Sequence, residues 1–191
     1  MQVDFAIELG ADDETLEFPW VAAEAGPRYY DLKRHPELLL SIAEASRFSE
    51  LAEFLSAVNS PTSLFETAKC DAWSSTEMKP EEDIFGATCK FGSYVDLVLS
   101  SRDPRVLFSE HEQLVIRPTE LLKRVPEIPA AAEFLVRRCY FTELESRMRE
   151  GFYVRTYVFG YGDDELQSRQ QWAIGMKLVE NALRQSSMTG K

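Results

Sequence analysis

The feature that most constrains this chain is a long run of alternating residues between positions 87 and 99. Every odd position in the run is small or apolar, whereas Lys90, Tyr94 and Asp96 occupy even positions. A period of two is typical of a strand that buries one face and exposes the other. The run therefore predicts a strand long enough to organise a sheet.

A second alternating segment lies upstream, over residues 65–73, and a polar connection over 74–85 separates the two. Two such segments in sequence predict an antiparallel pair. Cys70 lies at an apolar position of its segment. Two registers of the strand pair keep the apolar positions of both segments on one face. One pairs Cys70 with Cys89 but sets two lysines opposite each other. The other sets Asp71 opposite Lys90, and we prefer it because like charges directly opposite are destabilising.

Three further segments read as strands, and two read as helices. Residues 3–9 and 152–159 favour strands, and residues 15–18 are expected to return as a short partner of the first. Residues 130–141 are open to both readings, because Ala130-Ala131-Ala132 favours a helix; we expect a strand over 133–141, which can pair with 152–159. Apolar residues at helical spacing follow Pro36, and the clearest amphipathic pattern comes last. The expected fold is α+β, with an antiparallel sheet of about five strands packed against a 36–58 helical segment and a long C-terminal helix (163–186). We expect a single domain over residues 1–191.

Local signals predict how several of these elements begin and end. A capping box at 109–112 predicts a short helix that stops before Pro118, and a second short helix is expected over 119–124. Gly160-Tyr161-Gly162 is interpreted as the tight turn that ends the 152–159 strand. In the last helix, Met176, Val179 and Leu183 are predicted to face the core.

Charge excludes some classes of partner. The net charge is −11, and the first hundred residues hold 19 acidic but only 7 basic residues. Such a field repels phosphate backbones and anionic bilayers, so we expect neither a nucleic acid nor a membrane as partner. It favours solubility, with an acidic face for a basic partner as the alternative reading. Three cysteines without metal-ligand spacing, and no secretory leader, predict a cytoplasmic location.

Residues suited to catalysis are few. The chain has only two histidines, and His111 is expected to be exposed in the first turn of its helix. Cys70 and Cys89 fall on the buried parity of their strands, where a thiol behaves as a small inert hydrophobe. Acidic triplets at 12–14, 81–83 and 163–165 coincide with turns or a helix start, so we expect no metal site and no cofactor. No catalytic residue is assigned.

The polar parity of the sheet is where a binding site is predicted. Aromatic and charged side chains gather on that parity, as they do at binding surfaces. The candidate binding residues are Lys69, Asp71, Trp73, Lys90, Tyr94, Tyr153, Arg155 and Tyr157. The competing explanation is that a helix or the aromatic 19–35 segment simply covers this face.

Two functional hypotheses remain open from the sequence. The first is a non-catalytic binding or regulatory protein that recognises a partner chain or a small molecule on or under its central sheet. The second is a small enzyme with a hydrolase-like pocket that uses carboxylates and His111. A homodimer is a further open possibility for the partner.

Overall fold

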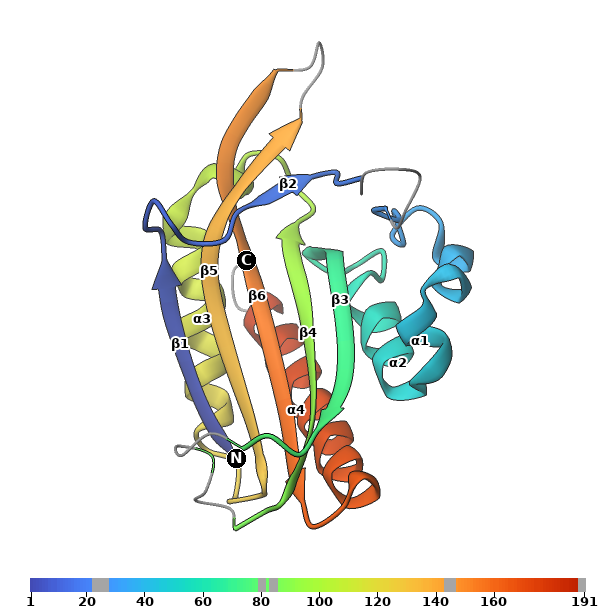
Figure 1. Ribbon diagram of the computed structural model, residues 1–191. Coiled ribbons are helices and arrows are strands. Elements are labelled where there is room, and N and C mark those ends of the chain that lie inside the picture. The colour runs from blue at the N-terminus through green and yellow to red at the C-terminus, as the bar shows by residue number, and fades with distance from the viewer. Residues whose placement is uncertain (22–27, 79–81, 83–85, 143–146, 189–191) are drawn as a thin grey trace.

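The computed structural model describes residues 1–21, 28–78, 82, 86–142 and 147–188. Its strands form one sheet in the order β1-β5-β6-β4-β3, with β2 pairing with β5 beyond the end of β1 (Figure 1). The strands are β1 (Gln2–Glu8), β2 (Leu16–Phe18), β3 (Phe65–Ser75), β4 (Cys89–Leu99), β5 (Ala130–Thr142) and β6 (Met148–Gly162).

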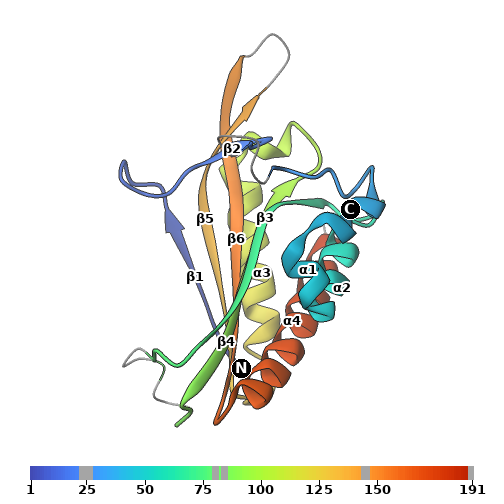
Figure 2. The same cartoon turned by 45° about the vertical axis from the view of Figure 1, so that its right-hand side comes forward.

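The described helices are η1 (Pro36–Ser41), α1 (Ala43–Arg47), α2 (Ser49–Val58), η3 (Pro104–Val106), α3 (Phe108–Leu122) and α4 (Glu165–Met188). Of these, α2, α3 and α4 cover one face of the sheet (Figures 1 and 2). The predicted α+β class is therefore confirmed. The sheet differs from the prediction in two respects: it has six strands, and β1 and β2 run parallel to β5. We call the face opposite the helices the outer face.

The 36–58 helical segment is broken twice. Ile42 and Phe48 both adopt extended backbone angles, so the segment divides into η1, α1 and α2. The second break has a packing reason, because the Phe48 ring lies 5.1 Å from Phe91 and 6.3 Å from Trp172. Burial of this ring between the sheet and α4 offsets the interrupted helical hydrogen bonds.

Helix α4 packs along the sheet and supplies much of the main core. Met176, Val179 and Leu183 are buried, as predicted, and the fully buried Trp172 donates a hydrogen bond of 2.8 Å to the Ser93 hydroxyl. The prediction for Gly160-Tyr161-Gly162 is wrong, since these residues continue β6 rather than forming a turn. A side chain at Gly160 would place its Cβ 2.0 Å from the Trp172 backbone nitrogen. The glycine therefore permits the close approach of α4 to the strand.

The β3–β4 pair is antiparallel as predicted, but both predicted registers are wrong. Cys70 lies opposite Val95, and Asp71 lies opposite Tyr94. The aromatic packing explains this register, because Trp73 faces Gly92. A Cβ at Gly92 would lie 2.9 Å from the Phe159 ring and 3.1 Å from the Trp73 ring. Only a glycine leaves room there for both aromatic rings.

A bulge between Thr67 and Cys70 also changes which side chains of β3 face the core. Phe65, expected on the polar parity, belongs to the main core, and Ala68, expected on the core parity, packs on the outer face. Beyond the bulge the prediction holds, since Cys70 and Ala72 face the helices. An inserted residue shifts the alternation by one, which reverses the faces on one side of it.

Helix α3 runs without interruption through Pro118, so the prediction of two short helices separated by this proline is wrong. Pro118 removes one helical hydrogen bond and crowds the preceding turn. Its neighbours Val115, Thr119 and Leu122 share a buried stripe at helical spacing. Packing of this stripe explains why the helix continues. The predicted cap is also absent, because the helix begins after Leu107 and no side chain caps it.

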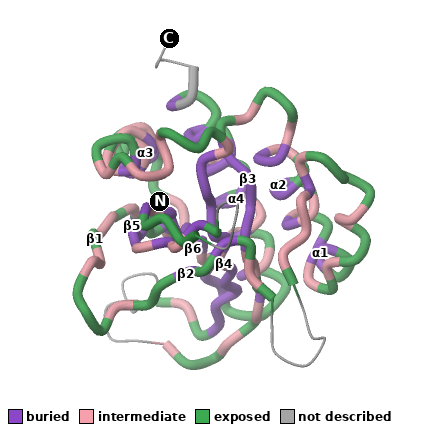
Figure 3. The backbone as a smooth tube through the Cα atoms, turned by 90° about the horizontal axis from the view of Figure 1, so that it is seen from above, coloured by how far each residue is buried: buried purple, intermediate pink, exposed green. Residues whose placement is uncertain are grey.

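The N-terminal segment does not form a hairpin. Residues 15–18, predicted to pair with β1, instead pair with β5 through Leu16, Glu17 and Phe18. The turn after β1 is closed by Asp13, whose carboxylate accepts a hydrogen bond from the Gly10 N–H. Strands β1 and β2 thus both pair with β5, and β2 lies further along β5 than β1 does. Buried residues concentrate in the central strands, whereas β1 is largely half-buried or exposed (Figure 3).

Candidate binding site on the outer face

The structure places all eight predicted binding residues on the outer face. Their burial differs widely. Lys90, Tyr153 and Arg155 are buried, Asp71 is exposed, and the other four are half-buried. One half of the outer face lies under β2 and the described residues next to it, and we call the other the open half. Tyr153 is buried in the half of the outer face that the N-terminal segment covers, whereas Lys90 is buried in the other half, beside Glu82.

The covered half lies under β2 (Leu16–Phe18). Trp20 and Tyr29 extend this cover, and the Trp20 indole donates a hydrogen bond of 2.7 Å to the Ala68 carbonyl oxygen. Beneath it is a second apolar cluster that comprises Leu16, Phe18, Ala68, Val98, Cys139, Phe141 and Tyr153. Here the competing explanation from the sequence is confirmed in part, because Trp20 and Tyr29 of the 19–35 segment pack on this face together with β2.

The cover is also fixed by polar contacts at its outer end. Glu66 on β3 accepts a hydrogen bond of 2.9 Å from the Tyr29 hydroxyl and forms an ion pair with Arg105. The Arg105 guanidinium lies 5.3 Å from the centre of the Phe18 ring and 4.9 Å from that of Phe141. A cation above two aromatic faces is an attractive arrangement. The cover is therefore an integral part of the fold.

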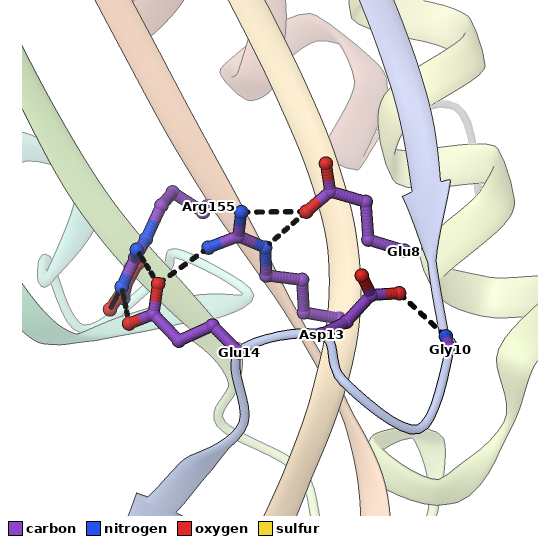
Figure 4. Close-up of polar contacts among 7 residues, drawn as sticks. Glu8, Gly10, Asp13, Glu14 and Arg155 are labelled. Atoms are coloured by element: carbon purple, nitrogen blue, oxygen red, sulfur yellow. Dashed lines mark hydrogen bonds and ion pairs between the residues drawn. The ribbon is translucent and has the colours of Figure 1, made fainter.

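An ion network marks the boundary between the two halves (Figure 4). Arg155 of β6 donates to both oxygens of Asp96 on β4, at 2.6 and 2.9 Å, and to both oxygens of Glu14, at 2.5 and 2.9 Å. Glu14 also accepts a bond of 2.8 Å from Arg137, which in turn pairs with Glu8 at 2.6 Å. Glu14 comes from the loop between β1 and β2, so the network ties that loop to the sheet.

The network controls the protonation of its members. Burial alone would lower the pKa of Arg155, but its hydrogen bonds to Asp96 and Glu14 outweigh that effect and raise it. Partial burial of Glu14 would raise its pKa, yet the two guanidinium groups beside it hold the pKa below its usual range. Both groups therefore remain charged at neutral pH. The predicted ligand-binding role of Arg155 is weakened, since its donors already have partners.

The open half is built around four aromatic side chains from three strands. Trp73 of β3 lies 6.5 Å from Tyr94 and 6.2 Å from Phe159, measured between ring centres. Tyr157 closes the group, at 6.0 Å from Tyr94 and 5.9 Å from Phe159, with the last pair stacked. All four are half-buried. We call these four residues the aromatic cluster.

A groove of about 900 Å³ runs across this half. It extends from β1 to β3, and its lining includes Trp73, Tyr157 and Phe159 together with acidic residues from β1 and β5. At one end Lys90 forms an ion pair of 2.7 Å with Glu82, which also accepts a hydrogen bond of 3.3 Å from the Tyr161 hydroxyl. Lys90 thus shapes the groove while its charge is compensated within the chain.

Sequence reasoning missed several residues of the groove. Phe159 shares the face of Tyr157 by simple alternation but was not among the candidates. Asp4, Glu82 and Glu133 were missed for a different reason: their place on the groove depends on strand order and on the β3–β4 connection. Glu81 and Asp83, from the same acidic triplet as Glu82, lie outside the described residues.

His111 does not belong to this site. The prediction that it is exposed is wrong, because only 1% of the residue is accessible. Its Nδ1 lies 3.0 Å from the Leu107 carbonyl oxygen, and its ring lies 5.6 Å from that of Phe152 on the helix-covered side of the sheet. Burial lowers the pKa of His111, so the imidazole is neutral at pH 7.

The cysteines also lie away from the groove lining. All three are free thiols; Cys89 and Cys139 are buried, and Cys70 is half-buried. Burial raises the pKa of Cys70 to about 12, which keeps it protonated and unreactive. Within the described ranges, no group of three or more His, Cys, Asp or Glu residues is placed to hold a metal ion.

Comparison with known proteins finds no matching family model, no matching curated protein and no matching solved structure. None of the helices described here is long and apolar enough to cross a membrane.

Proposed function

We propose that this protein is a non-catalytic binding protein that holds a partner chain or a small molecule on the open half of its outer face. The observation that carries this proposal is the aromatic cluster, whose four rings are only half-buried by the described chain. Tyrosine and tryptophan are enriched at binding surfaces because they bury a large area with few rotatable bonds.

The contrast with the covered half supports this reading. One half of the outer face is covered by β2, Trp20 and Tyr29, whereas the four rings of the aromatic cluster in the other half are only half-buried. Rings that served only to pack the sheet would gain from the same cover, since burial of apolar area is favourable. A partner supplies that missing burial when it binds.

The shape of the groove favours a partner chain over a small molecule. Its lining residues come from both sheet edges and from the strands between them, so the site is broad. Small-molecule sites are usually clefts or cavities that bury most of their ligand. The enzyme hypothesis has weaker support, because buried His111 lies on the opposite side of the sheet.

Selection from a random displayed peptide library, together with an NMR screen of a small-molecule fragment library, tests the proposal. Trp73→Ser and Tyr94→Ser, made singly, are expected to abolish binding of the selected ligands. Each should lower the free energy of unfolding by no more than about 1 kcal/mol, as is typical of sites outside the core. Ile174→Ser, which removes an exposed apolar side chain on α4, is the matched control and should retain binding.

The opposite results would contradict the proposal. If either serine variant loses several kcal/mol of stability, the ring is a core residue of the fold. If the selected ligands bind both serine variants as well as the unaltered protein, or if neither library yields a ligand, the open half is not a binding site.

A further inference from the structure

The two edge strands of the sheet, β3 and β1, differ in how far their backbone groups are satisfied (Figure 1). On β3, the Phe65 carbonyl oxygen accepts a hydrogen bond of 2.7 Å from the Lys33 ammonium group. The Thr67 N–H donates one of 3.1 Å to the Asn59 side chain, and a bulge follows directly. Side chains from other segments and the bulge therefore close this edge to a further strand.

Strand β1 carries no such protection in the part of the chain that the structure describes. Its register with β5 is continuous from Gln2 to Glu8, and it contains no proline, glycine or lysine. The Phe5 N–H donates a hydrogen bond of 2.8 Å to the carboxylate of its own neighbour Asp4, at an exposed position. An unblocked strand of this kind is a template for pairing with another strand.

The pairing of the neighbouring strands shows which backbone groups of β1 face outward. The Tyr161 N–H donates a hydrogen bond of 2.9 Å to the Pro129 carbonyl oxygen at the start of the β5–β6 pair. Counted in twos from Pro129, residues of β5 therefore direct their backbone groups to β6, and the residues between them direct theirs to β1. The β5 residue beside Phe5 is one of the latter, and in a parallel pair it bonds to the residues on either side of Phe5. The N–H and C=O groups of Val3, Phe5 and Ile7 thus point away from β5, along the open edge.

The sequence of β1 is complementary to itself in one antiparallel register. Centring two copies on Phe5 sets outward-facing residues opposite one another and sets no acid opposite an acid. The opposed pairs are Gln2 with Glu8, Val3 with Ile7, Asp4 with Ala6, and Phe5 with Phe5. A register centred on Asp4 would bring the two Asp4 side chains together, and one centred on Ala6 would set Asp4 opposite Glu8, which like charges disfavour. Charge therefore selects the Phe5-centred register.

Apolar side chains meet across the junction in this register. Val3 and Phe5 pack in part against the main core, and Ile7, on the same parity, is 43% exposed. Pairing with a second β1 strand would cover more of all three, and burial of apolar area is favourable. On the outer face, Glu8 already pairs with Arg137 at 2.6 Å, so its charge is compensated within the chain.

We infer that two copies of this chain associate by antiparallel pairing of their β1 strands in the Phe5-centred register, which makes one continuous sheet across a two-fold axis. Each outward-facing pair then exchanges both of its N–H···O=C hydrogen bonds. The Phe5 N–H leaves the Asp4 carboxylate for a carbonyl oxygen of the second copy. Because β1 lies outside the aromatic cluster, this association and the proposed binding function can hold or fail independently.

Sedimentation equilibrium at several protein concentrations tests the association. Each copy carries a net charge of −11, so the salt concentration should be about 0.15 M, at which repulsion is screened beyond about 8 Å. We expect dimers at protein concentrations up to about 0.1 mM. Ile7→Lys sets an ammonium group at the junction and should weaken dimerisation by about tenfold or more. Ile174→Lys makes the same change at a site on α4 that is 47% exposed, and should leave dimerisation unchanged.

Cysteine cross-linking tests the register. Asp4→Cys and Ala6→Cys are made in separate chains, which are oxidised alone and as a mixture. Position 4 of one copy faces position 6 of the other in a pair without backbone hydrogen bonds, whose Cα atoms lie about 4.5 Å apart, within reach of a disulfide. The mixture should therefore cross-link at least about tenfold faster than either variant alone, with the mixed product identified by its mass.

Several results would overturn the inference. These are a protein that stays monomeric throughout the concentration range, or a dimer that Ile7→Lys and Ile174→Lys weaken equally. Cross-linking of either cysteine variant alone as fast as the mixture would show a different register, and this comparison holds even if Ile7→Lys does not fold. Trp73→Ser, which tests the proposed function, should leave the dimer intact. A dimer that dissociates in Trp73→Ser would instead be formed through the open half.

Discussion

The two halves of the outer face are made by the same strands, yet their side chains differ in burial. Tyr153 and Tyr157 stand two alternations apart on β6, but Tyr153 is fully buried and Tyr157 is half-exposed. The difference comes from β2, which packs over Tyr153, whereas the loop before it reaches Arg155 through Glu14 at the boundary. Alternation therefore determines which face a side chain occupies, and the path of a distant segment determines whether that face is free.

The boundary between the halves consists of charged side chains that pair with one another. Asp96 is fully buried and Arg155 is 6% accessible, so each needs its partner within the protein. Glu14 adds a second carboxylate to Arg155 and connects the cover to it. A polar network at this position ends the apolar cluster and so limits how far the cover can extend.

Breaking this boundary is expected to have the largest effect. Arg155→Met leaves Asp96 buried without its cation, and removal of one member of a buried ion pair costs about 3–5 kcal/mol. Urea denaturation measures the loss directly. Asp96→Asn in the Arg155→Met background should recover part of it, because the uncompensated charge is then removed. A loss below about 1 kcal/mol for Arg155→Met would show that the pair does not hold the halves together.

A matched pair of truncations compares the halves themselves. Leu16→Ala, in the covered half, should lower the free energy of unfolding by about 2–3 kcal/mol, since Leu16 is buried beneath the cover. Tyr157→Ala, in the open half, should lower it by less than about 1 kcal/mol. Equal losses of stability for the two variants in chemical denaturation would contradict the difference between the halves, because both side chains would then belong to the core.

The sequence was sufficient to assign faces in the strands that alternate without interruption. Lys90, Tyr94 and Asp96 were placed on the outer face correctly because period two is a local property of the backbone. Phe65 was misplaced because nothing in residues 65–73 reveals the bulge at Thr67. His111 was misplaced because its burial depends on the packing of α3 against Phe152, which lies far away in the chain.

The candidate site was predicted in part for the same reason. Its tyrosines and tryptophan were found by parity, but the acidic residues of the groove were not. Asp4 and Glu133 become neighbours only because β1 pairs in parallel with β5, a contact between residues that are distant in sequence. The register that pairs Asp71 with Tyr94 depends on the fit of Trp73 over Gly92, which a charge-pairing argument does not capture.

The smallest expected effect concerns the pH dependence of the cover. The pKa of Glu14 is held below its ordinary value of 4.5 by Arg155 and Arg137. Its ionised form therefore contributes stability that is fully present above the unfolded-state pKa and is lost as the pH falls through the lower folded-state pKa. Because half of this side chain is exposed, the contribution should be less than about 1 kcal/mol. Glu14→Gln should lower the free energy of unfolding slightly at pH 7 and flatten its decline below about pH 5.

Glu17→Gln, an exposed change on β2, should leave that decline as it is in the unaltered protein. If urea titrations across this pH range show the same slope for Glu14→Gln and the unaltered protein, Glu14 does not secure the cover.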